Sequence, residues 1–172
     1  MATESKPITT VFLSYAQQDK GLKQELENHL AALQQSGQIA WWGEREIQPG
    51  TDWAQVIDPR LSTADLILLL MSADLLGSGY CSGAEVRQAL ERHSSGKALL
   101  IPIILRRVDV TGLPLRVLQA LPGDDKDGWK PVMAWGDRDE AWWKVAQGIR
   151  QATEMLHYWR GKETSPSEQK QP

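Results

Sequence analysis

The chain has 172 residues, of which 41% are hydrophobic and 24% are charged, and its formal net charge is −3. This length suits one domain with a sizeable core, and the near-neutral charge gives no reason to expect nucleic acid or an anionic membrane as the main partner. A single cysteine excludes an internal disulfide, and three scattered histidines show no metal-ligand spacing, so we expect no metal site. Residues 1–9 lack a signal-peptide core and no apolar run approaches membrane-spanning length, so we expect a cytoplasmic protein.

The first third of the chain predicts strands and helices in alternation. Residues 10–15 form an apolar run that predicts a buried strand. Asp19 follows as the predicted N-cap of a helix, in which leucines recur at helical spacing until residues 36–37. The pattern then predicts a strand at residues 39–42, a polar loop at 43–50, and a helix that begins at 51 or 52 and is ended early by Pro59.

The remaining chain continues this alternation. Residues 65–72 are apolar on both faces, as a central parallel strand must be, and a helix opens near Ser82. Residues 97–105 predict a strand in which Pro102 indicates a bulge or a sheet edge. The rest predicts loops with short helical turns at 106–130, a strand at 132–135, and a final helix on which one of Trp142 and Trp143 is buried and the other exposed.

The alternation of short strands and helices predicts the α/β class, with a five-stranded parallel sheet and helices on both faces. We expect a flexible N-terminus at residues 1–8 and a single domain at 9–160. Residues 161–172 are rich in Ser, Pro, Gln and Lys without an apolar pattern, and we expect a disordered tail or the start of a linker there.

The stretch at residues 76–86 contains the best catalytic candidate, Glu85. Ser82 stands three residues before Glu85, which is the spacing of a capping box that only satisfies backbone N–H groups at a helix start. Alternatively, a carboxylate just beyond a strand's carboxyl end faces the crevice where open α/β sheets bind ligands. The nearby glycines do not match the dinucleotide-binding fingerprint, because their spacing differs and no tight turn links them to the strand.

Several motifs, taken together and in order, resemble a TIR (Toll/interleukin-1 receptor) domain, most closely the bacterial subgroup. They are Val11 to Tyr15 with Asp19, Ile47 to Gly50 before Trp53, Leu61 to Asp65 before the central strand, Tyr80-Cys81 with Glu85, Ile101 to Ile103, and Arg138 to Ala141. The resemblance implies a flavodoxin-like fold. Members with this glutamate are often NAD⁺ glycohydrolases, some of which cyclise the product, whereas others only assemble.

The resemblance implies that Glu85 is the catalytic residue and that NAD⁺ is a substrate, with no cofactor. The strand ends at Ser14 and Tyr15, at 42–50 and at 72–85 share one edge of a parallel sheet, so one crevice can collect them. The candidates for substrate binding are Ser14, Tyr15, Trp42, Arg45, Gly50, Trp53, Tyr80 and Cys81.

Several of these candidates have an ordinary structural alternative. Trp42 and Trp53 are candidates to stack on a base, although tryptophans more often pack in a core. Arg45 can meet a phosphate or be merely solvated, and nucleophilic catalysis by Cys81 is disfavoured because no motif positions a base beside it. Two positions depart from the catalytic subfamily, with Cys81 where tryptophan is common and Gly43 where an acidic residue is common.

Two hypotheses for function follow. The first is an NAD⁺ glycohydrolase that cleaves the nicotinamide–ribose bond, with possible cyclisation of ADP-ribose, in bacterial antiviral or cell-death signalling. The second is a non-catalytic assembly module whose loop at residues 45–50 docks on a neighbouring TIR domain. Both predict self-association through TIR–TIR contacts, with a fused or separate sensor or effector as a further partner.

Overall fold

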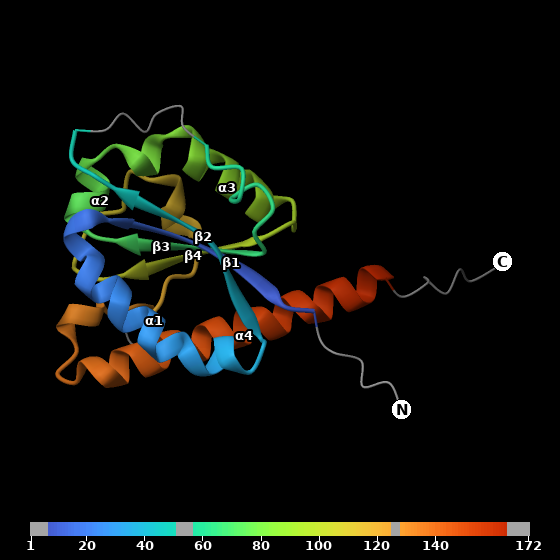
Figure 1. Cartoon of the computed structure of the whole chain (residues 1–172). Coiled ribbons are helices and arrows are strands. Elements are labelled where there is room, and N and C mark those ends of the chain that lie inside the picture. The colour runs from blue at the N-terminus through green and yellow to red at the C-terminus, as the bar shows by residue number, and fades with distance from the viewer. Residues whose placement is uncertain (1–6, 51–56, 125–127, 165–172) are drawn as a thin grey trace.

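The computed structural model describes residues 7–50, 57–124 and 128–164. Their core is a four-stranded parallel sheet in the order β2-β1-β3-β4, which confirms the α/β class and the parallel sheet (Figure 1). The strands are β1 (Thr9–Ala16), β2 (Ile39–Ile47), β3 (Leu66–Met71) and β4 (Leu99–Ile104). The α-helices are α1 (Lys20–Gln35), α2 (Ala73–Gly77), α3 (Ala84–Ser94) and α4 (Arg138–Thr164).

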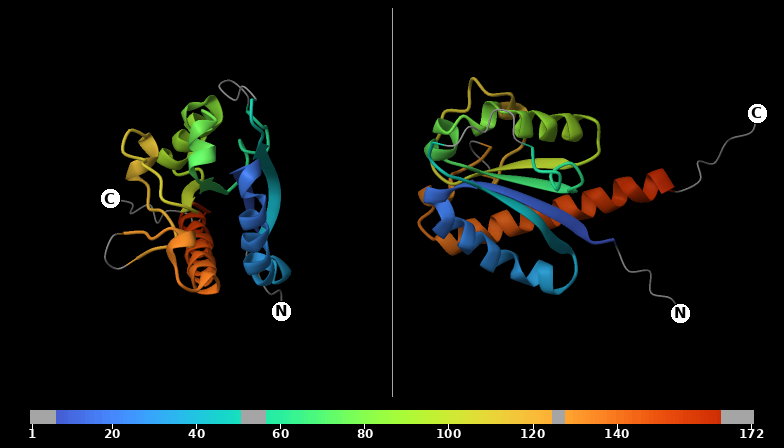
Figure 2. Two further views of the ribbon diagram at one scale, coloured as in Figure 1. Left: turned by 90° about the vertical axis from the view of Figure 1, so that its left-hand side faces the viewer. Right: turned by 45° about the horizontal axis from the view of Figure 1, so that its top comes forward.

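The helices form a layer on each face of the sheet. Helices α1 and α4 cover one face, and α2 and α3 cover the other (Figures 1 and 2). Each face has its own apolar core, and every residue of β3 is buried, as a central strand requires. On α4, Trp142 is fully buried whereas Trp143 is 58% exposed, which confirms the expected division between these neighbours.

Strand β4 forms one edge of the sheet, as Pro102 indicated. The backbone N–H groups of Leu99 and Leu105 donate toward the β3 side, whereas that of Ile104 donates away from it, to the carbonyl of Leu121. The direction of the backbone N–H alternates from one residue of a strand to the next, and Pro102 stands two residues before Ile104. The N–H that proline lacks at this position would therefore point to the outer side of β4, as that of Ile104 does. The proline therefore removes no hydrogen bond between β4 and β3.

Strand β2 forms the other edge and is longer than expected, because residues 43–47 belong to the strand rather than to a loop. A strand at the edge of a sheet has a neighbouring strand on one side alone and commonly carries charged side chains. The charged residues at 44–46 therefore fit an edge position. The register with β1 shifts by one residue, from Val11 opposite Trp41 to Phe12 opposite Gly43, which leaves Trp42 as the extra residue of a β-bulge.

The predicted fifth strand is wrong. Residues Val132–Ala134 form a 3₁₀ helix, η4, and the sheet of the described residues ends at β4. Leu121 pairs with Ile103 as an isolated bridge on the outer side of β4, in the place that a further strand would need. Val132 buries its side chain in the core beside α4 without joining the sheet.

Two helix boundaries also differ from expectation. Residues 51–56, where the helix after β2 was predicted to begin, lie outside the described residues, and residues 57–64 form turns and coil instead of helix. Helix α4 continues to Thr164, past the predicted domain end at residue 160, and the sequence from its first residue onward contains no proline before Pro166. No helix within the described parts of the chain is long and apolar enough to cross a membrane.

Candidate functional site

Glu85 lies in the first turn of α3, at the carboxyl end of the sheet, and its side chain is fully buried. The predicted capping box is wrong, because the N-cap of α3 is Gly83 and no side chain caps this helix start. The carboxylate instead accepts hydrogen bonds from three residues on other segments. Glu85 is thus held by the tertiary structure and not by its own helix.

The three donors surround both carboxylate oxygens of Glu85. The Nη2 of Arg45, on β2, lies 2.9 Å from Oε2, and its Nε lies 3.4 Å from Oε1. The backbone N–H of Asp58 donates to Oε2 over 2.8 Å, and the hydroxyl of Tyr80 donates to Oε1. Hydrogen bonds to a carboxylate from charged and neutral donors are among the stronger ones in proteins, so this arrangement fixes the Glu85 side chain firmly.

Tyr80 links Glu85 to the first strand. Tyr80 is the first residue of η2 (Tyr80–Ser82), and its hydroxyl oxygen lies 2.8 Å from Oγ of Ser14. Because the tyrosine proton is donated to Glu85, the Ser14 hydroxyl donates to Tyr80, which gives a chain from Ser14 through Tyr80 to Glu85. Burial, the negative charge of Glu85 and the hydrogen bond to it raise the pKa of Tyr80 well above its usual value, so this phenol stays a donor.

The bulge in β2 explains why Arg45 reaches Glu85. Before the bulge, Ile39 and Trp41 face the core beside α1, so an undisturbed strand would send Arg45 to that same face. The extra residue inverts the alternation, and Ile47 and Arg45 then face α3. Burial lowers the pKa of the Arg45 guanidinium, but the hydrogen bond and the charge of Glu85 outweigh this and raise it.

Gly43 contributes to the same geometry through close approach. A Cβ atom at this position would lie 2.8 Å from Nε of Arg60, so a larger residue requires the Arg60 side chain to move. The Arg60 guanidinium is paired with Asp58 at 2.7 Å, and the backbone of Asp58 holds Glu85. The glycine that departs from the family pattern therefore lets the turn at residues 58–60 pack against β2.

A cavity of about 340 Å³ lies at the carboxyl ends of the first two strands, between the turn after β2 and helix α2. Gly50 and Gln48 line it on one side, and Asp74 and Ser78 line it on the other. Its volume is in the range of small-molecule sites, roughly 300–1,000 Å³. Glu85 is absent from its lining. The carboxylate is fully buried and is already bonded to Arg45, Tyr80 and the backbone N–H of Asp58.

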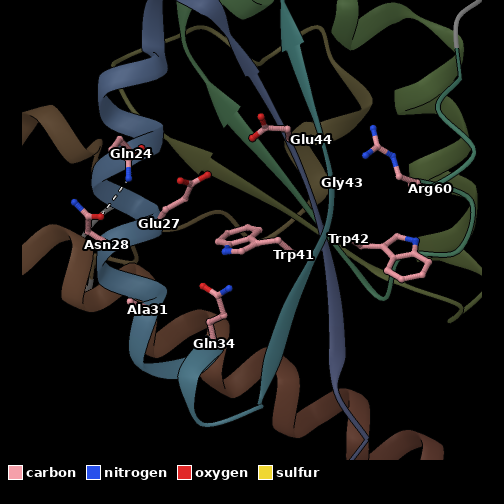
Figure 3. Close-up of a pocket in the computed structure, with 10 residues that line it drawn as sticks. All are labelled: Gln24, Glu27, Asn28, Ala31, Gln34, Trp41, Trp42, Gly43, Glu44 and Arg60. Atoms are coloured by element: carbon pink, nitrogen blue, oxygen red, sulfur yellow. Dashed lines mark hydrogen bonds between the residues drawn. The ribbon is translucent and has the colours of Figure 1, made fainter.

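Trp42 lies apart from Glu85, in a different hollow. Figure 3 shows Trp41 and Trp42 on opposite sides of β2, with Trp42 directed toward Arg60. Both line a pocket of about 520 Å³ between β2 and α1. Trp42 is 45% exposed and its Nε1 donates to Oγ1 of Thr63 over 2.8 Å. Its ring is available to solvent, but the structure does not bring it to the Glu85 carboxylate.

Two further predicted residues are not brought to Glu85, and one lies outside the described residues. Tyr15 is buried on the opposite face of the sheet, where the ammonium of Lys23 lies 5.2 Å from its ring centroid. Cys81 is buried, and burial raises the pKa of its thiol to about 12, which gives no support to a nucleophilic role. Trp53 falls among residues 51–56, outside the described part of the chain.

The structure thus brings Ser14, Arg45 and Tyr80 together around Glu85, and it adds the Asp58 N–H, which sequence reasoning missed. A backbone donor leaves no signature in a sequence. The pairing of Arg45 with Glu85 did have a signal, since a glycine after two tryptophans on a charged strand is compatible with a bulge. Among the described residues, no group of three His, Cys, Asp or Glu side chains is placed to hold a metal ion.

The parallel sheet with this carboxylate at its carboxyl end defines an α/β domain of the TIR type. The family described as TIR domain matches residues 11–132, and the chain belongs to this family. TIR domains act in signal transduction and commonly self-associate.

The chain is also 44% identical over 143 residues to "Uncharacterized protein y4lF" of Sinorhizobium fredii. This match covers 83% of the chain but 43% of that protein, so the chain spans less than half the length of this relative. No solved structure matches the chain significantly.

Proposed function

We propose that this TIR domain is an NAD⁺ glycohydrolase in which Glu85 stabilises the reacting ribose. The observation that carries the proposal is that Glu85 does not cap its helix. Its carboxylate is buried at the carboxyl end of the sheet and is held by Arg45, Tyr80 and the Asp58 N–H. Such a fixed, acceptor-only group at a crevice is arranged to bind hydroxyl groups and to face a developing cation.

The chemistry requires one carboxylate. The bond between C1′ of the ribose and the pyridinium nitrogen breaks, its electron pair goes to the nitrogen, and nicotinamide departs neutral without a general acid. The oxocarbenium-like ribose is stabilised by the negative charge of Glu85 until water adds to C1′ and releases a proton to solvent. Addition of another nucleophile of the same ADP-ribose in place of water gives a cyclic product.

Substrate entry has a defined requirement in this structure. Glu85 is fully buried, so the ribose hydroxyls must replace Arg45 or the Asp58 N–H as donors to its carboxylate. Arg45 is the residue that gains an alternative partner, because a guanidinium binds a diphosphate as well as a carboxylate. The exchange conserves the ion pairing of Arg45 and frees the Glu85 oxygens for the ribose.

The second candidate function is a non-catalytic assembly module. The observation that favours it is the completeness of the Glu85 contacts, since a carboxylate with three donors can serve only to join α3 to β2 and to the turn at residue 58. In that case residues 48–50, which are exposed, remain available to dock on a neighbouring TIR domain. Self-association belongs to both functions.

The test is nicotinamide release from NAD⁺ by the purified protein, both free in solution and concentrated on beads to promote assembly. Glu85→Gln is expected to lower the rate at least ~100-fold, as loss of a charge that stabilises a transition state does. Glu91→Gln is the matched control, because Glu91 is exposed on the same helix. Circular dichroism verifies that both variants fold.

The outcomes separate the two functions. Release that depends on Glu85 and not on Glu91 supports the enzyme. Release at the wild-type rate in Glu85→Gln refutes the role of Glu85, and the absence of release from folded wild-type protein in both states supports the assembly module.

A further inference from the structure

A third pocket lies at the amino end of the sheet, away from Glu85. It is formed by the last turn of α3, the turn that follows it, and the C-terminal part of α4, and its volume is about 520 Å³. Figure 1 shows that α3 and α4 both run toward this end of the sheet. Arg92 is seven residues beyond Glu85 on α3, which corresponds to roughly 10 Å along the helix axis. The two sites are therefore separate.

The pocket is strongly cationic. Arg92, Lys97 and Arg160 line it, and none of the described residues in its lining carries a carboxylate. The Nη1 of Arg92 donates to the carbonyls of Leu61 and Ala64 at 2.7 and 2.6 Å, which fixes the guanidinium without neutralising it. These contacts leave the positive charge of Arg92 inside the pocket for an anion to meet.

Among the described residues, the carboxylate of Asp65 lies next to the pocket without lining it, and it compensates part of the positive charge of Arg160. Asp65 accepts a hydrogen bond from Nη2 of Arg160 over 2.5 Å, and it also accepts from the backbone and hydroxyl of Thr10. Among the described residues of this cluster, Arg92, Arg160 and Lys97 carry positive charge and Asp65 carries negative charge. Burial lowers the pKa of Arg92, and the charges of Asp65 and Arg160 act on it in opposite directions.

An aromatic and an apolar side chain complete the pocket. Trp159 lines it and is 39% exposed, and Leu156 lies one turn earlier on the same helix. A volume of about 520 Å³ lies within the usual range of small-molecule sites. An indole beside guanidinium groups offers a stacking surface next to an anion site, which is the combination that a phosphorylated aromatic compound requires.

We propose that this pocket binds a nucleoside monophosphate, with its phosphate on Arg92, Lys97 and Arg160 and its base on the indole of Trp159. The site is independent of the chemistry at Glu85. It gives the domain a nucleotide-binding site at the end of the sheet opposite the candidate active site.

Equilibrium dialysis of the full chain tests the proposal, with AMP, adenosine and inorganic phosphate as separate probes. AMP is expected to bind at least 10-fold more tightly than either adenosine or phosphate alone, because only AMP supplies both parts. Lys97→Gln and Trp159→Ala are each expected to weaken AMP binding 3-fold or more. Lys20→Gln is the matched control, since Lys20 is an exposed lysine at the other end of the sheet.

Glu85→Gln separates this pocket from the candidate active site. AMP binding that is unchanged in Glu85→Gln but reduced in Lys97→Gln and Trp159→Ala supports the proposal, whether or not the domain cleaves NAD⁺. Circular dichroism verifies the fold of each variant. The proposal is overturned if AMP does not bind, if adenosine binds as tightly as AMP, or if the affinity falls in Glu85→Gln and not in Lys97→Gln.

Discussion

Two buried carboxylates at the carboxyl end of the sheet, Glu85 and Asp19, have opposite surroundings. Glu85 is fully buried and its two oxygens accept from Arg45, Tyr80 and the Asp58 N–H. Asp19 is 1% exposed, yet the donor to its carboxylate is the Ser72 hydroxyl, and its Oδ1 has no hydrogen-bond partner among the described residues. One carboxylate is saturated with donors and the other is not.

Local sequence alone does not assign the role of a carboxylate at a helix start. Both residues match a capping pattern, and neither side chain caps its helix in the structure. Glu85 turns to donors on β2, η2 and the turn at residue 58, and Asp19 turns to Ser72, at the end of β3. Tertiary contacts outweigh a cap that contributes about 1 kcal/mol.

The largest effect should come from removing the charged partner of Glu85. Arg45→Met leaves a buried carboxylate without its counter-ion, and breaking a buried ion pair from one side typically costs about 3–5 kcal/mol. Because 17% of the Arg45 side chain is exposed, water can replace part of the loss, and we expect about 3 kcal/mol in the free energy of unfolding. Urea denaturation measures it.

Arg138→Met is the matched control for this prediction. Arg138 also forms an ion pair with a carboxylate, that of Glu25, but 49% of the Arg138 side chain and 34% of the Glu25 side chain are exposed. Exposed pairs contribute little, so the midpoint of urea unfolding should barely move. Equal losses in Arg45→Met and Arg138→Met would mean that Glu85 finds other donors, and the contrast with Asp19 would disappear.

The next effect concerns the neutral donor. Tyr80→Phe removes the hydroxyl that links Ser14 to Glu85, and it leaves the buried Ser14 hydroxyl without this partner. An unsatisfied buried polar group costs about 1–3 kcal/mol, which urea denaturation can resolve. Tyr158→Phe is the control, because Tyr158 is exposed on α4 and should show no change. If the two variants were equally stable, the Tyr80 hydroxyl would contribute nothing to holding Glu85.

Sequence periodicity predicted most of the fold because each strand and helix carries its own signal. Burial follows directly from the sequence pattern in three places: the apolar run of β3, the leucines of α1, and the neighbouring Trp142 and Trp143. The prediction failed where neighbours decide the outcome. Val132 is apolar as a strand residue should be, but the outer side of β4 is already bridged by Leu121.

The candidate site could be predicted only as a set of strand ends. Parallel strands bring Ser14 and the region of Glu85 to one edge, so that part follows from topology. The side of β2 on which Arg45 lies depends on a single inserted residue, and a one-residue shift sends every following side chain to the other face. Tyr15 shows the same sensitivity, since it is adjacent to Ser14 but lies on the opposite face.

The smallest effect tests Asp19. Burial raises the pKa of this carboxyl above its usual value, although the Ser72 hydrogen bond and the charge of Arg106 oppose the shift. As pH rises from about 4, the unfolded chain therefore loses its proton before the folded protein does, and Asp19 progressively destabilises the fold. Asp19→Asn cannot ionise, so we expect its melting temperature relative to wild type to be higher at pH 7 than at pH 4.

Glu154→Gln is the control for this comparison, because Glu154 is exposed on α4 and exposed charges contribute little to stability. A difference for Asp19→Asn that moved the other way would mean that the Ser72 hydrogen bond and the charge of Arg106 outweigh burial, since both favour the ionised carboxylate. Asp19 would then resemble Glu85, and the crevice would contain two equivalent carboxylates. If the melting temperature of Asp19→Asn relative to wild type is higher at pH 7, as expected, the two carboxylates differ. Glu85 is then the one that the fold holds with donors on both oxygens.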